Sequence, residues 1–287
     1  MKIADHELAA QRRITVLGAT GFIGSHLARR LQELDVNLFA PRRTDTLAGM
    51  DLGDVIYCIG LSADFRSYPF ETAEAHACHL LRVLRDSRCR SFVYLSSARI
   101  YERNAAPARE EDAVQVSSLN PGDLYNISKL MGESLALAWK GKTAVVRLSN
   151  VYGEDFASQN FLSNIINQAV TTAKVILETS PDSEKDYISI DDVVDGLIQI
   201  TLRGQQDIYN LASGTNVCND ELARRISQLS NCQVAFAPGG VRVKFPVISV
   251  DRMRSEFGFQ PRNVLDELSN LVDSYKRHHA REKSSRR

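Results

Sequence analysis

The sequence predicts an α/β protein with a doubly wound parallel sheet of the Rossmann type and a smaller C-terminal α/β lobe. Apolar strand-like runs alternate with amphipathic helix-like segments through the first 150 residues. A glycine-rich turn lies directly between the first such strand and the first such helix. Strands that alternate with helices favour βαβ units, whose parallel sheets are covered by helices on both faces.

Strands are predicted from short apolar runs bounded by turn residues. They span residues 13–17, 36–40, 54–59, 92–95, 144–148, 174–178, 207–211 and 233–236. Helices are predicted where apolar residues recur every three or four positions. They span residues 22–34, 70–86, 124–139, 161–173, 192–202, 221–229 and 264–276, with a polar loop over 179–185. The charged tail from Lys276 to Arg287 is expected to be solvated and frayed rather than a binding arm.

Composition excludes several classes of protein. The 287 residues include 35 Lys and Arg and 35 Asp and Glu, so a net charge of zero leaves no electrostatic footprint for nucleic acid. No apolar run approaches the roughly 20 residues that cross a bilayer. Residues 1–13 lack the apolar core of a secretory signal, so we expect a cytoplasmic protein without membrane partners. The five cysteines form no CxxC pair, and no metal site is predicted.

The glycine-rich turn, GATGFIG at 18–24, carries the first functional signal. Glycines let the backbone turn tightly and approach a pyrophosphate, and a helix N-terminus offers free N–H groups and partial positive charge. Glycines also occur in ordinary turns, but this triplet follows the first strand of a βαβ series. We therefore predict a dinucleotide site at Gly18, Thr20, Gly21, Phe22, Ile23 and Gly24.

The residues after the second strand bear on which dinucleotide binds. NAD sites usually carry an acidic residue there for the ribose 2′-hydroxyl, and NADP sites carry arginine for the 2′-phosphate. Here the strand runs into Arg42 and Arg43, and no carboxylate appears before Asp45. We predict NADP as the cofactor, with NAD as the alternative. The other interpretation of the two arginines is a solvated loop.

A candidate reacting centre follows from a tyrosine and a lysine four residues apart. Tyr125 and Lys129 project from one face of the predicted helix. An adjacent ammonium is expected to lower the tyrosine pKa from its usual value near 10, which suits proton transfer at neutral pH. Ser96 and Ser97 come at the end of the fourth predicted strand, at the edge where open parallel sheets bind ligands. A tyrosine and a lysine at this spacing are common by chance. The nearby strand end with its serines strengthens the prediction that the pair is catalytic.

Six segments together resemble a known family: residues 18–24, 92–102, 125–129, 147–153, 185–193 and 208–214. The chain resembles the extended short-chain dehydrogenase/reductases, the NAD(P)-dependent nucleotide-sugar epimerases and dehydratases. The resemblance implies that Ser97 is the catalytic serine, that Tyr125 is the acid/base, and that Lys129 also holds the nicotinamide ribose. It further implies substrate contacts at Ser97, Asn150, Lys185 and Arg242.

Departures from the family pattern narrow the reaction. Relatives that dehydrate their sugar carry Asp-Glu after the catalytic serine or threonine, where this chain has Ala98 and Arg99, so elimination is disfavoured. The absence of an Asp after the second strand favours a keto-reductase over an NAD-retaining epimerase. His76 stands where the family often has asparagine, and we interpret it as a packed helix residue rather than a catalytic one.

The family resemblance also implies a domain division and a reaction class. The division comprises a dinucleotide-binding domain over 1–150, to which 186–212 return, and a substrate lobe of 151–185 and 213–287. The predicted function is hydride transfer on a nucleotide-diphosphate sugar, by a keto-sugar reductase or a C4-type epimerase. A non-catalytic NAD(P)-binding regulator is the alternative. A homodimer is expected through helices 70–86 and 124–139.

Overall fold

The computed structural model describes residues 12–61 and 65–285. A six-stranded sheet in the order β2-β1-β3-β4-β5-β9 forms its centre, and every pair of neighbours is parallel. The strands are β1 (Arg13–Leu17), β2 (Asn37–Phe39), β3 (Asp54–Tyr57), β4 (Ser91–Ser97), β5 (Lys142–Leu148) and β9 (Ile208–Leu211). The strand order reverses beside β1, as in a doubly wound Rossmann sheet. The predicted fold class is confirmed.

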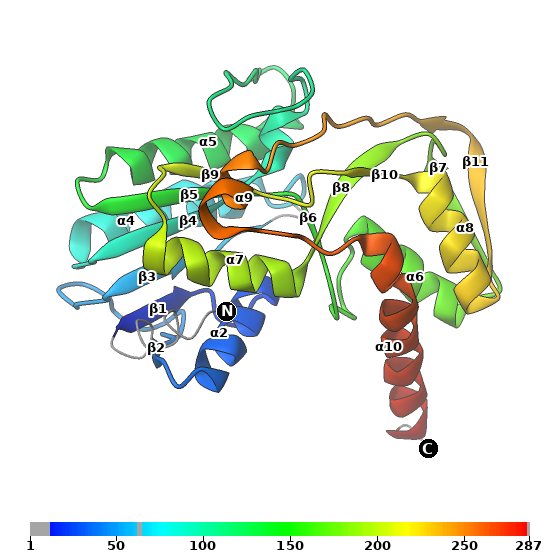
Figure 1. Ribbon diagram of the computed structural model, residues 1–287, viewed down its shortest axis with the longest axis horizontal. Helices are drawn as coiled ribbons and strands as arrows, with labels where there is room; N and C mark the ends of the chain where they lie inside the picture. Colours follow the sequence, from blue (N-terminus) through cyan, green and yellow to red (C-terminus); the bar gives the residue numbers. More distant parts are fainter. Residues whose placement is uncertain (1–11, 62–64, 286–287) are drawn as a thin grey trace.

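Helices cover both faces of this sheet (Figure 1). One face carries α2 (Phe22–Glu33) and α7 (Ile190–Arg203), and the other carries α4 (His79–Asp86) and α5 (Asp123–Ala138). Successive strand residues alternate between the two cores because side chains alternate across a strand. In β4, for example, Val93 and Leu95 pack with α2 and α7, whereas Phe92 and Tyr94 pack with α4 and α5.

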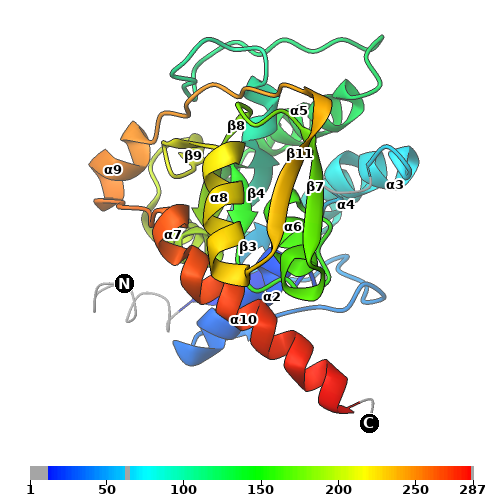
Figure 2. The same cartoon turned by 90° about the vertical axis from the view of Figure 1, so that its right-hand side faces the viewer.

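The rest of the chain forms two small sheets and a second apolar core. One sheet has the order β10-β8-β6 and the other pairs β11 with β7. Their strands are β6 (Asn150–Tyr152), β7 (Lys174–Thr179), β8 (Glu184–Ser189), β10 (Asn216–Cys218) and β11 (Gln233–Val241). Helices α6 (Phe161–Thr171), α8 (Asn219–Ser230) and α10 (Val264–Ser285) pack around them (Figure 2). The predicted boundaries of the two domains stay a prediction.

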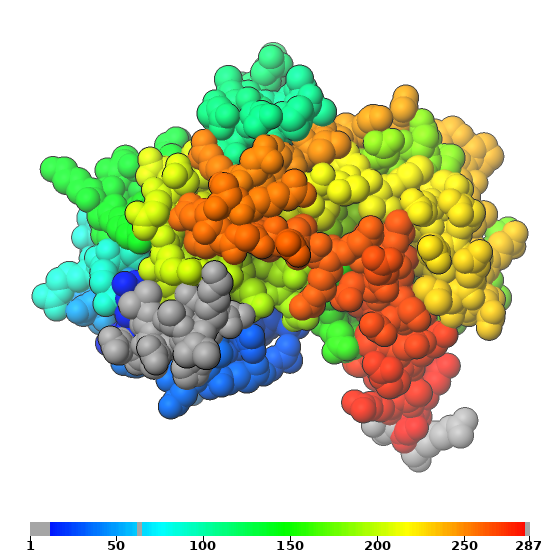
Figure 3. Space-filling model, in the orientation of Figure 1, coloured from blue at the N-terminus to red at the C-terminus, as the bar shows by residue number. Residues whose placement is uncertain are grey.

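The small helix α9 (Asp251–Phe257) connects the two parts of the molecule. Figure 3 shows its segment, in orange, on one face between the yellow-green of α7 and the yellow of α8. Just before α9 the chain pairs with the loop that follows β4, through hydrogen bonds between Ala108 and both Val247 and Ser249. The long loop after β4 is thereby attached to the C-terminal part of the chain.

Three short strands, β6, β8 and β10, were not predicted. The polar start of β8, Glu184 to Asp186, has no local strand pattern and is ordered by pairing with its two neighbours. The expectation that the tail is frayed was wrong as far as the structure describes it, because α10 continues to Ser285, although residues 280–284 are exposed as expected. His278 stacks on Phe156 with ring centroids 4.0 Å apart, and this contact holds the charged segment. None of the helices within 12–61 and 65–285 has a stretch apolar and long enough to span a bilayer.

The glycine turn supplies a test of the fold. A Cβ on Gly24 would lie 2.1 Å from the Gly18 carbonyl oxygen, whereas a Cβ on Gly21 would meet that oxygen at 3.5 Å, an ordinary contact. We expect Gly24→Ala to lower the free energy of unfolding by about 3 kcal/mol, because α2 must move away from β1. Gly21→Ala is the matched control and should leave it nearly unchanged. Urea unfolding measures both, and equal effects would contradict this packing.

Candidate active site at the carboxyl edge of the sheet

The predicted site residues are distributed along the carboxyl edge of the central sheet. Gly18 directly follows β1, and Ser97 is the last residue of β4. Tyr125 and Lys129 lie one turn apart on α5, which packs against β4 and β5. Open parallel sheets bind ligands at this edge, near the point where the strand order reverses.

The glycine turn has the geometry of an anion cradle. Gly18 adopts a φ of 87°, which favours glycine, and its carbonyl accepts the N–H of Gly21 at 3.1 Å. Helix α2 then begins at Phe22 with neither a side-chain cap nor an acidic residue in its first turn. Thr20 and Gly21 are exposed, and Phe22 and Ile23 are half-buried. An uncapped helix N-terminus beside bare glycines fits the pyrophosphate of a dinucleotide.

Tyr125 is a buried phenol whose pKa is set by opposing effects. Burial raises the pKa of Tyr125, while a hydrogen bond with the Ser97 side chain and the charge of Arg99 oppose the rise. The expectation that Lys129 lowers this pKa in the ligand-free protein was wrong. Lys129 directs its Nζ to the Leu95 carbonyl oxygen at 2.9 Å and lies 6.0 Å from the centre of the Tyr125 ring.

Burial also shifts the pKa of Lys129. The surrounding protein lowers the pKa of Lys129 to about 7, since desolvation outweighs the opposing effects of Glu133 and Cys58. A Cβ on Gly60 would lie 3.3 Å from its Nζ and 3.2 Å from His76 Nε2, so the chain after β3 passes close to both side chains. A pKa lowered this far suits Lys129 to proton exchange near neutral pH.

A π-helical turn, Glu74–Cys78, interrupts the predicted helix 70–86 between α3 (Pro69–Ala73) and α4. Its Ala75 and His76 carbonyls accept the hydroxyls of Tyr57 and Tyr94 at 2.7 and 3.1 Å. Such turns leave backbone carbonyls without their usual helical donors, and the two tyrosines satisfy them here. The turn therefore places His76 in the site.

His76 packs edge-on against Tyr125, with ring centroids 5.3 Å apart. Its Nε2 accepts the N–H of Leu61 at 3.3 Å, and its Nδ1 lies 2.8 Å from Ser128 Oγ. Burial and the nearby charge of Lys129 lower the pKa of His76 to about 2, so the ring is neutral. A neutral ring that accepts at Nε2 carries its proton on Nδ1 and donates to Ser128. This arrangement agrees with a packed rather than a catalytic histidine.

A buried ion pair supports the site from behind. Arg147 of β5 donates two hydrogen bonds to Glu133 of α5, at 2.7 and 3.1 Å, and Ser96 donates to the same carboxylate. Arg147 also donates to the Tyr101 hydroxyl at 2.6 Å, and this hydroxyl donates to Asn210 at 2.9 Å. These bonds connect α5 to β4, β5 and β9.

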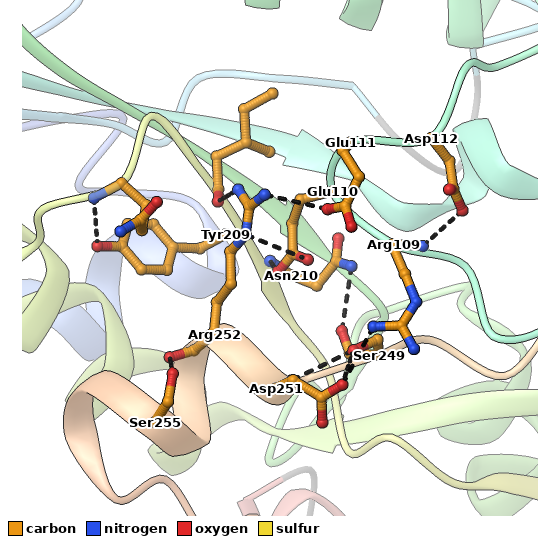
Figure 4. Close-up of polar contacts among 12 residues, drawn as sticks. Arg109, Glu110, Glu111, Asp112, Tyr209, Asn210, Ser249, Asp251, Arg252 and Ser255 are labelled. Atoms are coloured by element: carbon orange, nitrogen blue, oxygen red, sulfur yellow. Dashed lines mark hydrogen bonds and ion pairs between the residues drawn. The ribbon is translucent and has the colours of Figure 1, made fainter.

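The network continues to the surface through Glu110. Its carboxylate accepts the backbone N–H of Asn210 at 3.0 Å, and Arg252 of α9 lies 3.6 Å away (Figure 4). Arg252 also pairs with the exposed Glu111 at 3.0 Å, and Asn210 donates to the Ser249 carbonyl at 3.1 Å. The loop after β4 is thus held to α9 by charge as well as by backbone hydrogen bonds.

Removing one partner of the buried pair tests its role. Glu133→Ala leaves the Arg147 charge uncompensated in the interior, and we expect a loss of ~3–5 kcal/mol in the free energy of unfolding. The control is Glu33→Ala, which removes a surface pair with Arg30 worth less than about 1 kcal/mol. Denaturant unfolding compares the two variants, and a loss no larger than that of the control would contradict the assigned role.

Three of the residues expected to bind substrate lie on β6, on β8 and just after β11. Asn150 begins β6 and donates through Nδ2 to the Asp186 carbonyl at 2.8 Å. Lys185 of β8 places its Nζ 4.9 Å from the centre of the Phe161 ring. Arg242 follows β11 and pairs through Nε with the exposed Asp182 at 2.8 Å, rather than with Ser97 or Tyr125. Their roles as substrate contacts stay predictions.

The two arginines expected to select the cofactor are exposed in the loop after β2. The Arg42 backbone N–H donates to Asp45 Oδ2 at 2.8 Å, which closes a tight turn. The charge of Arg43, together with burial, lowers the pKa of His79 on α4, so this guanidinium lies within electrostatic reach of the helix. Both side chains are accessible at the sheet end next to β1, and their role is untested.

Sequence reasoning missed two residues at the site. The Arg99 guanidinium carbon lies 5.1 Å from the centre of the Phe65 ring and 5.9 Å from that of Tyr125, and the Phe65 and Tyr125 rings are 5.2 Å apart. Phe65 is buried. Arg99 entered the sequence argument only as a departure from the dehydratase pattern, and no periodicity marks Phe65. The position of Arg99, two residues after Ser97, was the available signal.

Comparison with known proteins decides the family. The profile of the NAD dependent epimerase/dehydratase family matches residues 14–54 and 48–212. The chain belongs to the NAD-dependent epimerase/dehydratase family. It is 23% identical to a dTDP-4-dehydro-6-deoxy-D-allose reductase of Streptomyces bikiniensis, over 95% of this chain and 98% of the relative.

Solved structures share the fold of this family. MoeE5 in complex with UDP-glucose and NAD has a TM-score of 0.78 and 20% identity, over 93% of this chain and 99% of that one. RMD from Pseudomonas aeruginosa complexed with NADPH has a TM-score of 0.77 and 19% identity, over 93% of this chain and 98% of that one. Structural neighbours of this fold thus bind either NAD or NADPH.

Proposed function

We propose that the protein is a nucleotide-sugar oxidoreductase, a keto-sugar reductase or a C4-type epimerase, that uses Ser97, Tyr125 and Lys129. The observation that carries the proposal is the position of Tyr125, which is buried at the sheet edge that also bears the glycine turn, close enough to Ser97 for that side chain to affect its pKa. A regulator that only binds the cofactor has no use for a buried proton-transfer pair. Membership of the epimerase/dehydratase family supports the substrate class.

Each residue of the proposed site has its own role in the reaction. The nicotinamide cofactor, when bound, supplies or accepts the hydride. Tyr125 gives its hydroxyl proton to the sugar oxygen during reduction and takes it back during oxidation. Ser97 donates a hydrogen bond to the same oxygen, and this bond strengthens as negative charge develops there. Lys129, with a pKa of about 7, holds a proton in reserve near Tyr125.

The cofactor fits the residues present. The exposed Gly21 and the uncapped start of α2 would hold the pyrophosphate, and Lys129 would hold the nicotinamide ribose. We propose NADP as the preferred form because Arg42 and Arg43 are exposed beyond β2, where a 2′-phosphate would lie. NAD is the alternative.

Removal of one hydroxyl tests the acid/base assignment. We expect Tyr125→Phe to lower turnover by roughly 10²- to 10⁴-fold, because the proton donor is lost, while cofactor affinity is retained. Turnover is measured with a panel of UDP-, GDP-, CDP- and dTDP-sugars and their 4-keto forms, as NADPH consumption or as epimer formation. Stoichiometric NADPH consumption identifies a reductase, and an unchanged cofactor pool with product identifies an epimerase.

The matched control for this experiment is Tyr187→Phe. Tyr187 is buried and its hydroxyl has no hydrogen-bond partner, so its loss preserves the packing. Unchanged turnover in Tyr125→Phe would remove this residue from the mechanism. A wild-type protein that binds cofactor but turns over none of these sugars would favour the regulatory alternative.

The cofactor preference has its own test. We expect NADPH to bind at least tenfold more tightly than NADH, because a charge-assisted contact to the 2′-phosphate contributes about 1.5 kcal/mol or more. The double variant with Arg42→Ala and Arg43→Ala should lose this difference and keep its NADH affinity. Titration of cofactor fluorescence measures both constants. Tighter binding of NADH by the wild-type protein would overturn the NADP assignment.

The proposed homodimer has a candidate surface on the outer side of α3, α4 and α5. Phe70, Leu81, Met131 and Leu137 are apolar side chains that are at least two-fifths exposed on these helices. Exposed apolar side chains that gather on adjacent helices often mark a protein interface. Their exposure supports the homodimer as part of the proposal, in which two copies bury these side chains against each other.

A further inference from the structure

Arg99 is fixed to the reacting centre by its backbone. It lies in the 3₁₀ turn Ala98–Tyr101 that directly follows β4, and its N–H donates to Ser97 Oγ at 3.2 Å. Its guanidinium extends over the Phe65 and Tyr125 rings, with its central carbon 5.9 Å from the centre of the phenol ring. The planar cation therefore lies close to the Tyr125 ring, near enough for its charge to oppose the rise in the pKa of the phenol.

The hydrogen-bonding capacity of this guanidinium is not satisfied within the described part of the protein. Arg99 Nε is buried and has no hydrogen-bond partner. The carboxylate of Glu102 lies 4.0 Å from Nη2, beyond hydrogen-bond distance, and its side chain is 38% exposed. A buried donor without a partner is costly, and a ligand that accepts its hydrogen would remove this cost.

A second cationic side chain, that of Lys185, lies within electrostatic reach of Arg99. Burial and the charge of Arg99 both lower the pKa of Lys185, so the two side chains are within electrostatic reach of one another. Glu102 opposes this effect only in part. Among the described residues, these two cations have one partly solvated carboxylate near them, which leaves an excess of positive charge there. Two cations within electrostatic reach of one another favour an anionic ligand nearby.

The geometry indicates which part of a substrate supplies that anion. The oxygen on the reacting carbon must lie within hydrogen-bonding distance of the Tyr125 hydroxyl. A guanidinium that covers the same phenol reaches substituents on the next carbons of the sugar. In a nucleotide sugar that reacts at C4, the diphosphate is attached at C1, across the ring, whereas C5 and its substituent C6 are adjacent. A carboxylate at C6 matches the fork of donors of a guanidinium.

We propose that Arg99 binds a carboxylate on the sugar, so that the substrates are nucleotide-diphosphate uronic acids or their keto forms. This inference rests on the proposed function and narrows its substrate class. Lys185, which lies within electrostatic reach of Arg99, adds to the attraction for the same anion. Arg99 is accordingly a specificity-determining residue, and neutral sugars leave its buried Nε without a partner.

The test compares sugars that differ at C6. Binding of UDP, UDP-glucose and UDP-glucuronic acid to the NADP-loaded protein is measured by calorimetry, together with the pair GDP-mannose and GDP-mannuronic acid. We expect the wild-type protein to bind the uronic acid of one pair about tenfold or more tightly than its neutral partner, as for a hydrogen bond to a charged group. Arg99→Gln should remove this preference and leave the affinity for UDP or the neutral sugar unchanged.

Two further variants make the result specific. Arg99→Lys keeps the charge without the planar fork and should retain part of the preference. Arg85→Gln removes an exposed arginine near the end of α4 and is the matched control, with no expected change. The melting temperature of each variant shows whether it is folded.

Different failures have different meanings. Equal binding of neutral and acidic sugars by the wild-type protein overturns this inference and leaves the proposed function standing. If Arg99→Gln weakens binding of UDP as much as binding of the uronic acid, Arg99 contacts the diphosphate. That result also overturns the inference. If neither pair of nucleotide sugars binds, the inference fails, and the proposed function is decided by turnover of the CDP- and dTDP-sugars.

Discussion

The close packing of α5 on β4 and β5 is the constraint on which the site depends. Gly132 makes it possible, because a Cβ there would lie 2.1 Å from the Tyr94 hydroxyl and 2.6 Å from the His76 carbonyl oxygen. One residue further along, Glu133 forms the bidentate pair with Arg147 and fixes the helix along its axis. Since Lys129 and Tyr125 lie one and two turns before Glu133, the same contact sets where both face the sheet edge.

Burial, rather than pairing of charges, dominates the electrostatics of this site. It raises the pKa of Tyr125, lowers that of Lys129 to about 7 and keeps His76 neutral. Each shift disfavours a charged side chain where water is excluded. The buried Nε of Arg99 has no hydrogen-bond partner and is left to a ligand. The exclusion of water that shifts these pKa values therefore also leaves a buried donor of Arg99 for an anionic ligand.

Local pattern was sufficient for the central sheet and its helices. Short continuous apolar runs placed β1, β3, β4, β5 and β9 because each is buried on both faces, and periodicity placed α2, α5 and α7. It failed where neighbours decide the structure. Strand β8 starts with charged residues and forms through pairing, and the π turn at 74–78 depends on two tyrosine hydroxyls from β3 and β4. Neither partner is adjacent in sequence, so no local window contains the cause.

The sequence by itself determined the sheet, the glycine turn, and the positions of Ser97, Tyr125 and Lys129, because these follow from periodicity, spacing and strand ends. Only the tertiary structure decided the direction of the Tyr125 pKa, since desolvation depends on everything that surrounds the phenol. The tertiary structure also brought Phe65, His76 and Arg99 to Tyr125 from three separate segments. Such contacts join residues up to 60 positions apart, and their energies exist only once the chain has folded.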